Sequence, residues 1–493
     1  MNIISLNFIL FCIATVVAFY IMPRKWRWVI LLGASFVFYF AVGKKALITM
    51  LCVAVFTYLV GRLMEKAGTA NKKRLLILAI AVTMIAGWLM VIKIKDAAGV
   101  DIRFLITPLG ISYVSFSLIS YLVDIYWEKE KAETNLGKFL LYVFYFPKIS
   151  QGPISRYADL KSTLYTPMTV SYNDMCFGMQ RMLYGFFKKL VVADRIAIFT
   201  GAVFGDISSC SGSVIIVASV LASFQLYCDF SGYMDIALGF SEMLGVRMDE
   251  NFKRPFFSKS AAEFWRRWHI TLGSWFKNYI YTPVVMSKPV KKMGKACRKK
   301  GWKKLGNGLM KTVALASVWV LTGLWHGTGA NYIVWGLYWG AIIIFSAVFE
   351  DAIQGLTKIL RINTEAPSWK LFQMLRTFAI FTGGILLTNL GTLAEFKGAI
   401  YQMIYRLGPS ALVSGELAVK GLTHDHWVVI LWSIILIMVL DILEEKRGDV
   451  RQQIAELNAP VRWVIYALGI TVVLLLGIYG VNYSSSGFAY EHF

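Results

Sequence analysis

His326 lies in the middle of an apolar stretch in which an ionisable side chain is unfavourable. From Thr312 to Phe349 the chain contains no Lys, Arg, Asp or Glu. An ionisable residue inside a segment of membrane-spanning length is a functional-site hypothesis by default. Histidine changes charge near neutral pH, so His326 suits proton transfer in either direction. The alternative is a neutral histidine that is hydrogen-bonded to a neighbour in the core.

His269 is the second candidate residue. It lies one helical turn after Trp265, in a segment where aromatic side chains recur at helical spacing and Arg266 and Arg267 occupy other positions. This pattern predicts a helix at the membrane interface, where His269 alone would be expected to pack. The presence of His326 in the apolar centre shifts the interpretation of His269 towards a functional pair.

The apolar runs around these residues predict a membrane protein. The chain has 493 residues, of which 57% are hydrophobic, whereas soluble chains have about 45–50% apolar residues. Repeated runs near the length needed to cross a bilayer predict an all-α polytopic fold with about 10–12 transmembrane helices, plus re-entrant and interfacial helices. We expect a single integral-membrane domain over residues 1–493. The candidate spans are residues 3–22, 28–43, 46–61, 75–92, 104–127, 180–204, 213–228, 312–325, 332–349, 375–391, 427–441 and 463–481.

The net charge of +22 does not require a nucleic-acid partner, and we expect none. Cytoplasmic loops of membrane proteins collect Lys and Arg, which explains the excess. The most basic segment, at about residues 286–311, is predicted to be cytoplasmic. Topology alone accounts for this segment, but it can also form a cationic surface for a phosphate-rich donor or an acidic carrier protein. Its candidate donor-binding residues are Lys291, Lys292, Arg298, Lys299 and Lys300.

Several chemistries are disfavoured by what the sequence lacks. It has no P-loop, no dinucleotide-binding glycine fingerprint and no HExxH segment. The six cysteines are scattered without metal or redox spacing. We therefore expect no metal site, and neither an ATP-driven pump nor a zincin protease.

The central third of the chain combines broken backbone with buried acids. Pro147, Gly152 and Pro153 are expected to interrupt any helix there. Three acids follow in a mostly apolar stretch: Asp229, Asp235 and Glu242. Asp229 can cap a following helix, or the acids can be structural partners of Arg247 or Lys253. In a transporter or flippase, Asp229 and Asp235 can instead form a proton relay with His326.

Four blocks of the sequence resemble the signature of the bacterial membrane-bound O-acyltransferase (MBOAT) family. They are long, and they occur in the order and near the spacing of that family, so the resemblance covers most of the chain. Within that family, it resembles the branch of membrane subunits that serve alginate O-acetylation. The blocks are QGPISRY at 151–157, DFSGYMDIALG at 229–239, NFKRPFFSKSAAEFWRRWHITLGSWFKNYIYTP at 251–283 and LTGLWHGTGANYIVWGLYWG at 321–340.

This resemblance implies transfer of an acyl group to a hydroxyl. His326 is then the expected catalytic residue, and His269 resembles a second histidine of the polysaccharide-modifying branch. A neutral His326 can take the hydroxyl proton, while His269, or indole and backbone N–H groups, can stabilise the oxyanion. The resemblance implies no tightly bound cofactor and a thioester donor, either acetyl-CoA or another acyl thioester.

The chain ends in an aromatic tail at about residues 483–493, which contains Phe488, Tyr490 and Phe493. An interfacial anchor explains these side chains. The tail also resembles C-terminal motifs of bacterial acyl-transfer systems in which the tyrosine is a proposed acyl relay. Tyr490 is therefore a third candidate site residue, because a phenolic oxygen can carry a covalent intermediate.

The sequence thus predicts a multi-pass O-acetyltransferase of the bacterial inner membrane. Its expected partners are the lipid bilayer, an extracytoplasmic acetyltransferase and a polysaccharide acceptor. D-alanyl transfer to teichoic acids from a carrier-protein thioester is the nearest alternative. A proton-coupled transporter or flippase is an alternative of another class, and palmitoylation of a protein is a third.

Overall fold

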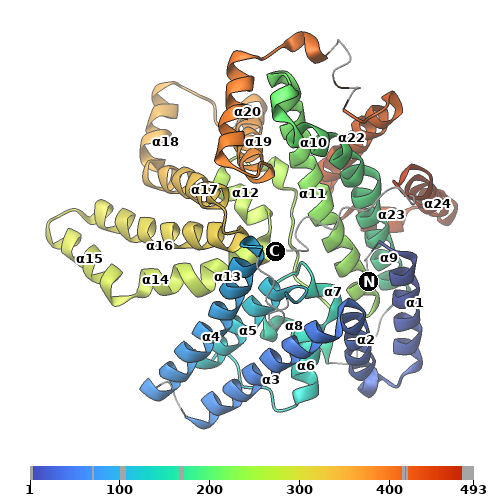
Figure 1. The fold of residues 1–493 in the computed structure, drawn as a ribbon, viewed down its shortest axis with the longest axis vertical. Coiled ribbons are helices and arrows are strands. Elements are labelled where there is room, and N and C mark those ends of the chain that lie inside the picture. Colours follow the sequence, from blue (N-terminus) through green and yellow to red (C-terminus); the bar gives the residue numbers. More distant parts are fainter. Residues whose placement is uncertain are drawn as a thin grey trace. The chain divides into compact units, whose positions relative to one another are not determined.

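The computed structural model describes residues 4–68, 71–99, 107–165, 171–412, 417 and 420–479, and over these ranges the chain is built from helices and their connections (Figure 1). In the described part, nine helices are long and apolar enough to cross a membrane, and Leu6–Ile21 and Ile111–Tyr126 are shorter apolar helices. The predicted all-α polytopic fold is confirmed. Phe252 and Trp268 form an isolated antiparallel bridge.

The chain divides into two compact units, each of which is described by itself. The first unit comprises residues 1–194, 227–250 and 442–493, as far as they are described. Its elements are α1 (Leu6–Ile21), η1 (Arg24–Trp26), α2 (Arg27–Val42), α3 (Lys44–Lys66), α4 (Lys72–Ala97), α5 (Ile111–Tyr126), α6 (Leu136–Phe144), α7 (Phe146–Ile149), α8 (Tyr157–Leu164), α9 (Tyr172–Phe186), the π-helical η2 (Phe187–Ala193), α23 (Val450–Glu456) and α24 (Ala459–Leu476).

The second unit comprises residues 195–226 and 251–441. Three helices have residues in both units: α10 (Asp194–Gly205), α11 (Gly212–Met243) and α22 (His424–Arg447). The remaining elements are η3 (Ile207–Ser209), η4 (Pro255–Phe257), α12 (Ala261–Arg267), α13 (Ile270–Phe276), the π-helical η5 (Lys277–Tyr281), α14 (Thr282–Met286), α15 (Lys288–Lys299), α16 (Lys303–His326), α17 (Ala330–Val348), α18 (Glu350–Ile359), α19 (Pro367–Asn389), α20 (Leu393–Tyr405) and η6 (Pro409–Leu412).

Local sequence sets where several helices begin. At the start of α9, Ser171 Oγ accepts a hydrogen bond from the Asp174 N–H, and the Asp174 carboxylate accepts one from the Ser171 N–H. Thr392 and Glu395 make the same reciprocal pair at the start of α20. Each capping box satisfies two backbone donors that have no partner within the helix.

The predicted break around Pro147 is confirmed. Helix α6 ends at Phe144, the short α7 ends at Ile149, and residues 152–156 are not helical. Gly152 adopts a φ of 89°, which a residue with a Cβ rarely adopts. Residues 149–155 are buried, so this irregular backbone is enclosed by protein, as non-helical backbone in a membrane protein must be.

The acids of the central third have basic partners in the first unit. Lys189 Nζ lies 2.6 Å from Asp229 Oδ1 and 2.9 Å from Asp194 Oδ1, and all three side chains are at most 7% exposed. The preceding Lys188 pairs with Asp235. Asp229 lies inside α11, so the suggestion that it caps a following helix is wrong. The basic partners of Asp229 and Asp235 on η2 were not predicted.

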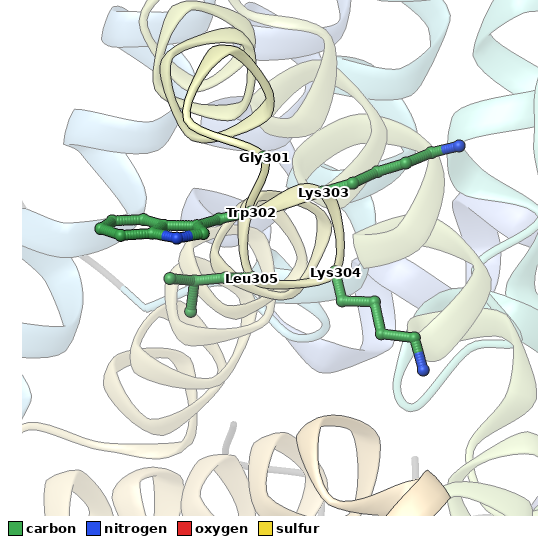
Figure 2. Close-up of a pocket in the computed structure, with 5 residues that line it drawn as sticks. All are labelled: Gly301, Trp302, Lys303, Lys304 and Leu305. Atoms are coloured by element: carbon green, nitrogen blue, oxygen red, sulfur yellow. The ribbon is translucent and has the colours of Figure 1, made fainter.

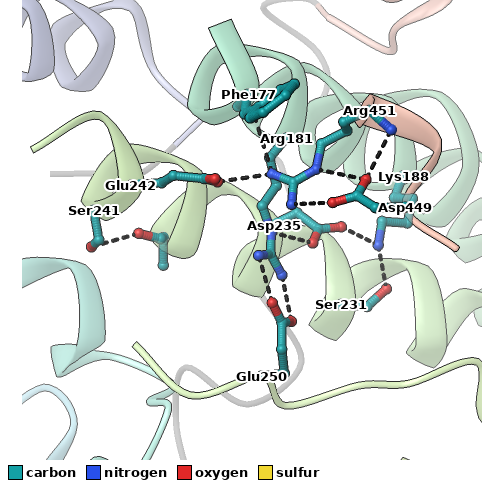
Figure 3. Close-up of polar contacts among 11 residues, drawn as sticks. Phe177, Arg181, Lys188, Ser231, Asp235, Ser241, Glu242, Glu250, Asp449 and Arg451 are labelled. Atoms are coloured by element: carbon teal, nitrogen blue, oxygen red, sulfur yellow. Dashed lines mark hydrogen bonds and ion pairs between the residues drawn. The ribbon is translucent and has the colours of Figure 1, made fainter. Parts of the chain in front are cut away.

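Two arginines extend this network of ion pairs (Figure 3). Arg181 contacts Asp235 at 3.1 Å and Glu250 at 2.6 Å. Arg451 contacts Glu242 at 2.8 Å, and it also binds Asp449 at the start of α23. The network therefore joins α9, α11 and the start of α23 within the first unit, and it balances the charge of the acids that the sequence places in an apolar stretch.

The triad of Lys189, Asp194 and Asp229 predicts a strong dependence of stability on the lysine. Lys189→Met leaves two buried carboxylates without this cation, and loss of one partner of a buried ion pair costs about 3–5 kcal/mol. We expect a clear fall in the denaturation midpoint of the detergent-solubilised protein. The matched control is Lys304→Met, because the side chain of Lys304 is 93% exposed in its pair with Asp351. Equal midpoints for the two variants would contradict this account.

Candidate active site

His326 is the last residue of α16 and lies close to the crossing of α16 and α17. Two glycines permit this crossing. A Cβ on Gly323 would lie 2.7 Å from a backbone oxygen of α17, and a Cβ on Gly336 would lie 2.6 Å from a backbone oxygen of α16. Small residues allow membrane helices to approach this closely. The crossing therefore fixes His326 against the side chains of α17.

Two indoles enclose the His326 ring. Its centroid lies 4.6 Å from the ring of Trp325 and 4.5 Å from the ring of Trp335, each at an interplanar angle of 67°. All three side chains are buried, and His326 is 7% exposed. The aromatic wall continues through Trp265, Trp319 and Trp339, whose rings contact each other at 5.0–6.2 Å. Such a wall excludes water and strengthens polar interactions at the site.

The backbone at His269 differs from the sequence prediction. The aromatic spacing predicted one helix through this segment, but α12 ends at Arg267 and α13 begins at Ile270. Trp268 is extended and His269 is left-handed, with a φ of 47°. The extended Trp268 forms a bridge with Phe252, which interrupts the helix. His269 is 2% exposed, so interfacial packing does not describe its position.

Asn251 holds the His269 ring. The Asn251 Oδ1 atom lies 3.1 Å from His269 Nδ1, and it accepts hydrogen bonds from the Thr271 N–H at 3.1 Å and the Thr271 hydroxyl at 2.9 Å. Burial lowers the pKa of His269 to about 3. The imidazole is therefore neutral at pH 7.

The structure brings the two predicted histidines to one aromatic side chain. The His269 ring centroid lies 6.1 Å from that of Trp325, and Trp325 also contacts His326. Both histidines belong to the second unit. Two buried histidines beside one indole form a water-poor site that can take and return a proton. Tyr490, the third candidate, lies outside the described residues.

Sequence reasoning missed the residues that support the histidines. Asn251 and Thr271 stand inside the block from 251 to 283, but their positions gave no sign that they meet at the His269 ring. Trp325 was adjacent to His326 in sequence, yet its contact with His269 depends on tertiary structure. The helical spacing of aromatic residues within the 265–279 segment also gave no indication that His269 is left-handed.

The predicted basic segment forms an exposed hairpin of α15 and α16 in the second unit. Lys292, Lys299 and Lys300 are exposed, as is Arg298, while Lys291 is half-buried. Figure 2 shows an open hollow at the tip of the hairpin, lined by Gly301, Trp302, Lys303, Lys304 and Leu305. The lining includes one indole, Trp302, and two lysines, Lys303 and Lys304, whose side chains point away from the indole (Figure 2). It does not contain either candidate histidine.

No group of three or more His, Cys, Asp or Glu side chains that could hold a metal ion is found among the described residues. The groups around the two histidines that can take part in chemistry are the imidazoles, the indoles and the Asn251 amide and Thr271 hydroxyl groups. This set suits proton transfer and hydrogen bonding to a substrate.

Comparison with known proteins gives a consistent set of relatives. The sequence model of the membrane-bound O-acyltransferase family (MBOAT) matches residues 109–296. The chain is 30% identical over 399 residues to the probable alginate O-acetylase AlgI of Pseudomonas fluorescens. The matched region covers 80% of this chain and 73% of that protein. It is 30% identical to the peptidoglycan O-acetyltransferase of Helicobacter pylori over 50% of this chain and 49% of the relative. It is 29% identical to the teichoic acid D-alanyltransferase of Bacillus subtilis over 50% of this chain and 60% of the relative.

The crossing of α16 and α17 predicts sensitivity at Gly336. A Cβ there meets backbone, so Gly336→Ala must separate the helices and move Trp335 away from His326. We expect a loss of stability of about 1–3 kcal/mol and a fall in catalytic rate that can reach about 10²-fold, because small displacements of a site are costly. Gly355→Ala is the control, since nothing lies within 4 Å of a Cβ at that position. Denaturation midpoints and single-turnover rates of the two variants test this; indistinguishable variants would refute it.

Proposed function

The chain belongs to the membrane-bound O-acyltransferase family, and from this membership we propose that it transfers an acetyl group from a cytoplasmic thioester towards hydroxyls of an extracytoplasmic polysaccharide. It is a multi-pass membrane enzyme that catalyses O-acyl transfer. The observation that carries the proposal is the pair of buried histidines, His269 and His326, on one indole, Trp325. Acyl transfer needs proton acceptance and oxyanion stabilisation in a site that excludes water.

The residues divide the chemistry as follows. The acceptor hydroxyl oxygen attacks the thioester carbonyl carbon, His326 takes the hydroxyl proton, and the carbon–sulfur bond breaks as the proton passes to the leaving thiol. N–H groups around the site stabilise the oxyanion. The aromatic wall of α12, α16 and α17 keeps the site dry, which strengthens these contacts.

The acetyl group is supported by the relatives with the longest matches. The alginate O-acetylase relative covers 80% of this chain, whereas the D-alanyltransferase relative covers 50% at similar identity. D-alanyl transfer is the second candidate, because that relative is still 29% identical. The polysaccharide acceptor is proposed from the names of the relatives, which act on alginate, peptidoglycan and teichoic acid.

The donor is proposed to be acetyl-CoA or another acyl thioester that reaches the enzyme from the cytoplasm. The exposed cations of α15 are suited to the phosphates of such a donor. We place the enzyme in the inner membrane, where an extracytoplasmic acetyltransferase would complete transfer to the glycan. Tyr490 is proposed as the acyl relay between the two proteins, because a phenolic oxygen can carry the acetyl group.

Replacement of His326 tests the enzyme directly. We expect His326→Gln to lower O-acetyl transfer by about 10²–10⁴-fold, because a general base contributes that much. The measurement is acetate released by mild base from purified cell-surface polysaccharide, in cells that carry the wild-type gene, the variant or no gene. His424→Gln, at the start of α22, is the matched histidine control.

The same assay separates the remaining possibilities. Full acetylation by a folded, membrane-inserted His326→Gln variant would refute the proposed catalytic role of His326. D-alanine in place of acetate in the released material would select the second candidate. Retained acetylation by Tyr490→Phe would remove the relay and leave direct transfer at His326.

Charge reversal on α15 and at the adjoining Lys300 tests the donor surface. We expect Lys292→Glu with Lys299→Glu and Lys300→Glu to raise the KM for acetyl-CoA while leaving kcat nearly unchanged. Salt should reduce the difference, because ions screen exposed charges over about 8–10 Å near physiological ionic strength. Lys358→Glu with Lys397→Glu is the control, since both of these lysines are exposed on other helices. An unchanged KM in the α15 variant would assign the basic segment to topology alone.

A further inference from the structure

We propose that Asn251 is a positioning residue, which fixes His269 as the neutral Nδ1–H tautomer and makes Nε2 the hydrogen-bond-accepting atom of that ring. This inference rests on the proposed function, because it assigns a role within the same site. It changes the role first expected for His269. A neutral ring that presents a lone pair through Nε2 cannot donate a hydrogen bond from that atom to an oxyanion.

The tautomer follows from the contacts of one oxygen atom. The Thr271 backbone N–H can only donate, and it lies 3.1 Å from Asn251 Oδ1. This contact identifies the facing amide atom as the oxygen and not the nitrogen, because two donors would repel. An amide oxygen can only accept, so the His269 Nδ1 at 3.1 Å must carry the proton. In a neutral imidazole, Nε2 then carries the lone pair.

Backbone contacts hold Asn251 in place for this role. The Ile270 N–H donates to the Asn251 carbonyl oxygen at 3.0 Å, and the Lys253 N–H donates to the Arg267 carbonyl oxygen at 2.9 Å. These bonds flank His269 on both sides in sequence. Asn251 is 1% exposed, so its side chain has little room to turn away.

The left-handed backbone of His269 gives these contacts a second purpose. A residue with a Cβ held in this region costs about 1–3 kcal/mol and persists only when its surroundings over-determine it. The bonds from Asn251 and its neighbours supply that restraint. They aim the imidazole at Trp325, the indole that it shares with His326.

The consequence is a division of labour at the site. His269 and His326 are both suited to accept protons or hydrogen bonds in their neutral forms. Stabilisation of the oxyanion then falls to N–H donors, of which the indoles and the backbone are the available kinds. In this assignment Asn251 acts through its contact with the His269 ring.

Nitrogen NMR of the histidine rings tests this inference. The chain has five histidines, so ¹⁵N-histidine labelling in nanodiscs gives few ring signals, and His269→Gln identifies the pair that belongs to His269. We expect Nδ1 of His269 to be protonated and Nε2 to be unprotonated near pH 7. Asn251→Leu, which has a similar size but no acceptor, should release the proton to Nε2, whereas Asn251→Asp should keep Nδ1 protonated.

The acyl-transfer rate provides the second measurement. We expect Asn251→Leu to lose about 10²-fold, because misorientation of a catalytic imidazole is costly, and Asn251→Asp to retain more activity than Asn251→Leu. Gln402→Leu is the control, because it removes another buried amide, one that donates to the Ser208 carbonyl oxygen. It should leave the His269 signals unchanged.

Two results would overturn the inference. One is a wild-type His269 with its proton on Nε2, and the other is an Asn251→Leu variant that keeps the Nδ1 proton and the wild-type rate. The NMR measurement needs no substrate. A wild-type protein with the expected Nδ1 proton but no acyl transfer would therefore refute the proposed function and leave the tautomer assignment intact.

Discussion

Two imidazoles are held out of water beside one indole, and this constraint shapes the site in the second unit. Removal of a charged ring from water costs hydration, so burial favours the neutral form of His269. Indoles meet the requirement because they bury apolar area and offer N–H donors without adding charge. The glycines at the crossing of α16 and α17 follow from the same need, since they let the helices bring Trp335 onto His326.

The first unit solves the opposite problem. Lys188 and Lys189 of η2 are buried, and each lies at hydrogen-bonding distance from an acidic partner. The π-helical segment η2 places consecutive lysines, Lys188 and Lys189, on two different acids of α11. An extra residue in a helical turn shifts the direction of the following side chains, and π-helical turns are frequent where geometry is unusual. The buried ion pairs of η2 are thus held by contacts within the first unit.

Much of this arrangement could be predicted from the sequence. The apolar runs predicted the membrane helices, and proline and glycine predicted the break near Pro147. The unfavourable free energy of an ionisable group in an apolar segment identified His326 as a candidate. The partners could not be predicted, because they depend on tertiary contacts between residues far apart in the chain. The pairing of Asp229 with Lys189 crosses 40 positions, and that of Asn251 with His269 crosses 18. Periodicity also concealed the change of backbone at His269, since helical spacing of aromatic residues continues across it.

The left-handed conformation at position 269 also limits which residues that position can hold. Asparagine, aspartate and glycine adopt such a backbone more readily than other types, and histidine is tolerated more often than most. An alanine there would remove the ring and keep the strained backbone without the bond that restrains it, so its effect would mix lost chemistry with altered folding. An asparagine suits the backbone and retains a polar side chain. The local backbone therefore restricts position 269 to a few residue types, whatever the reaction requires. A residue that acts in the chemistry at this position must also be one that tolerates the left-handed conformation.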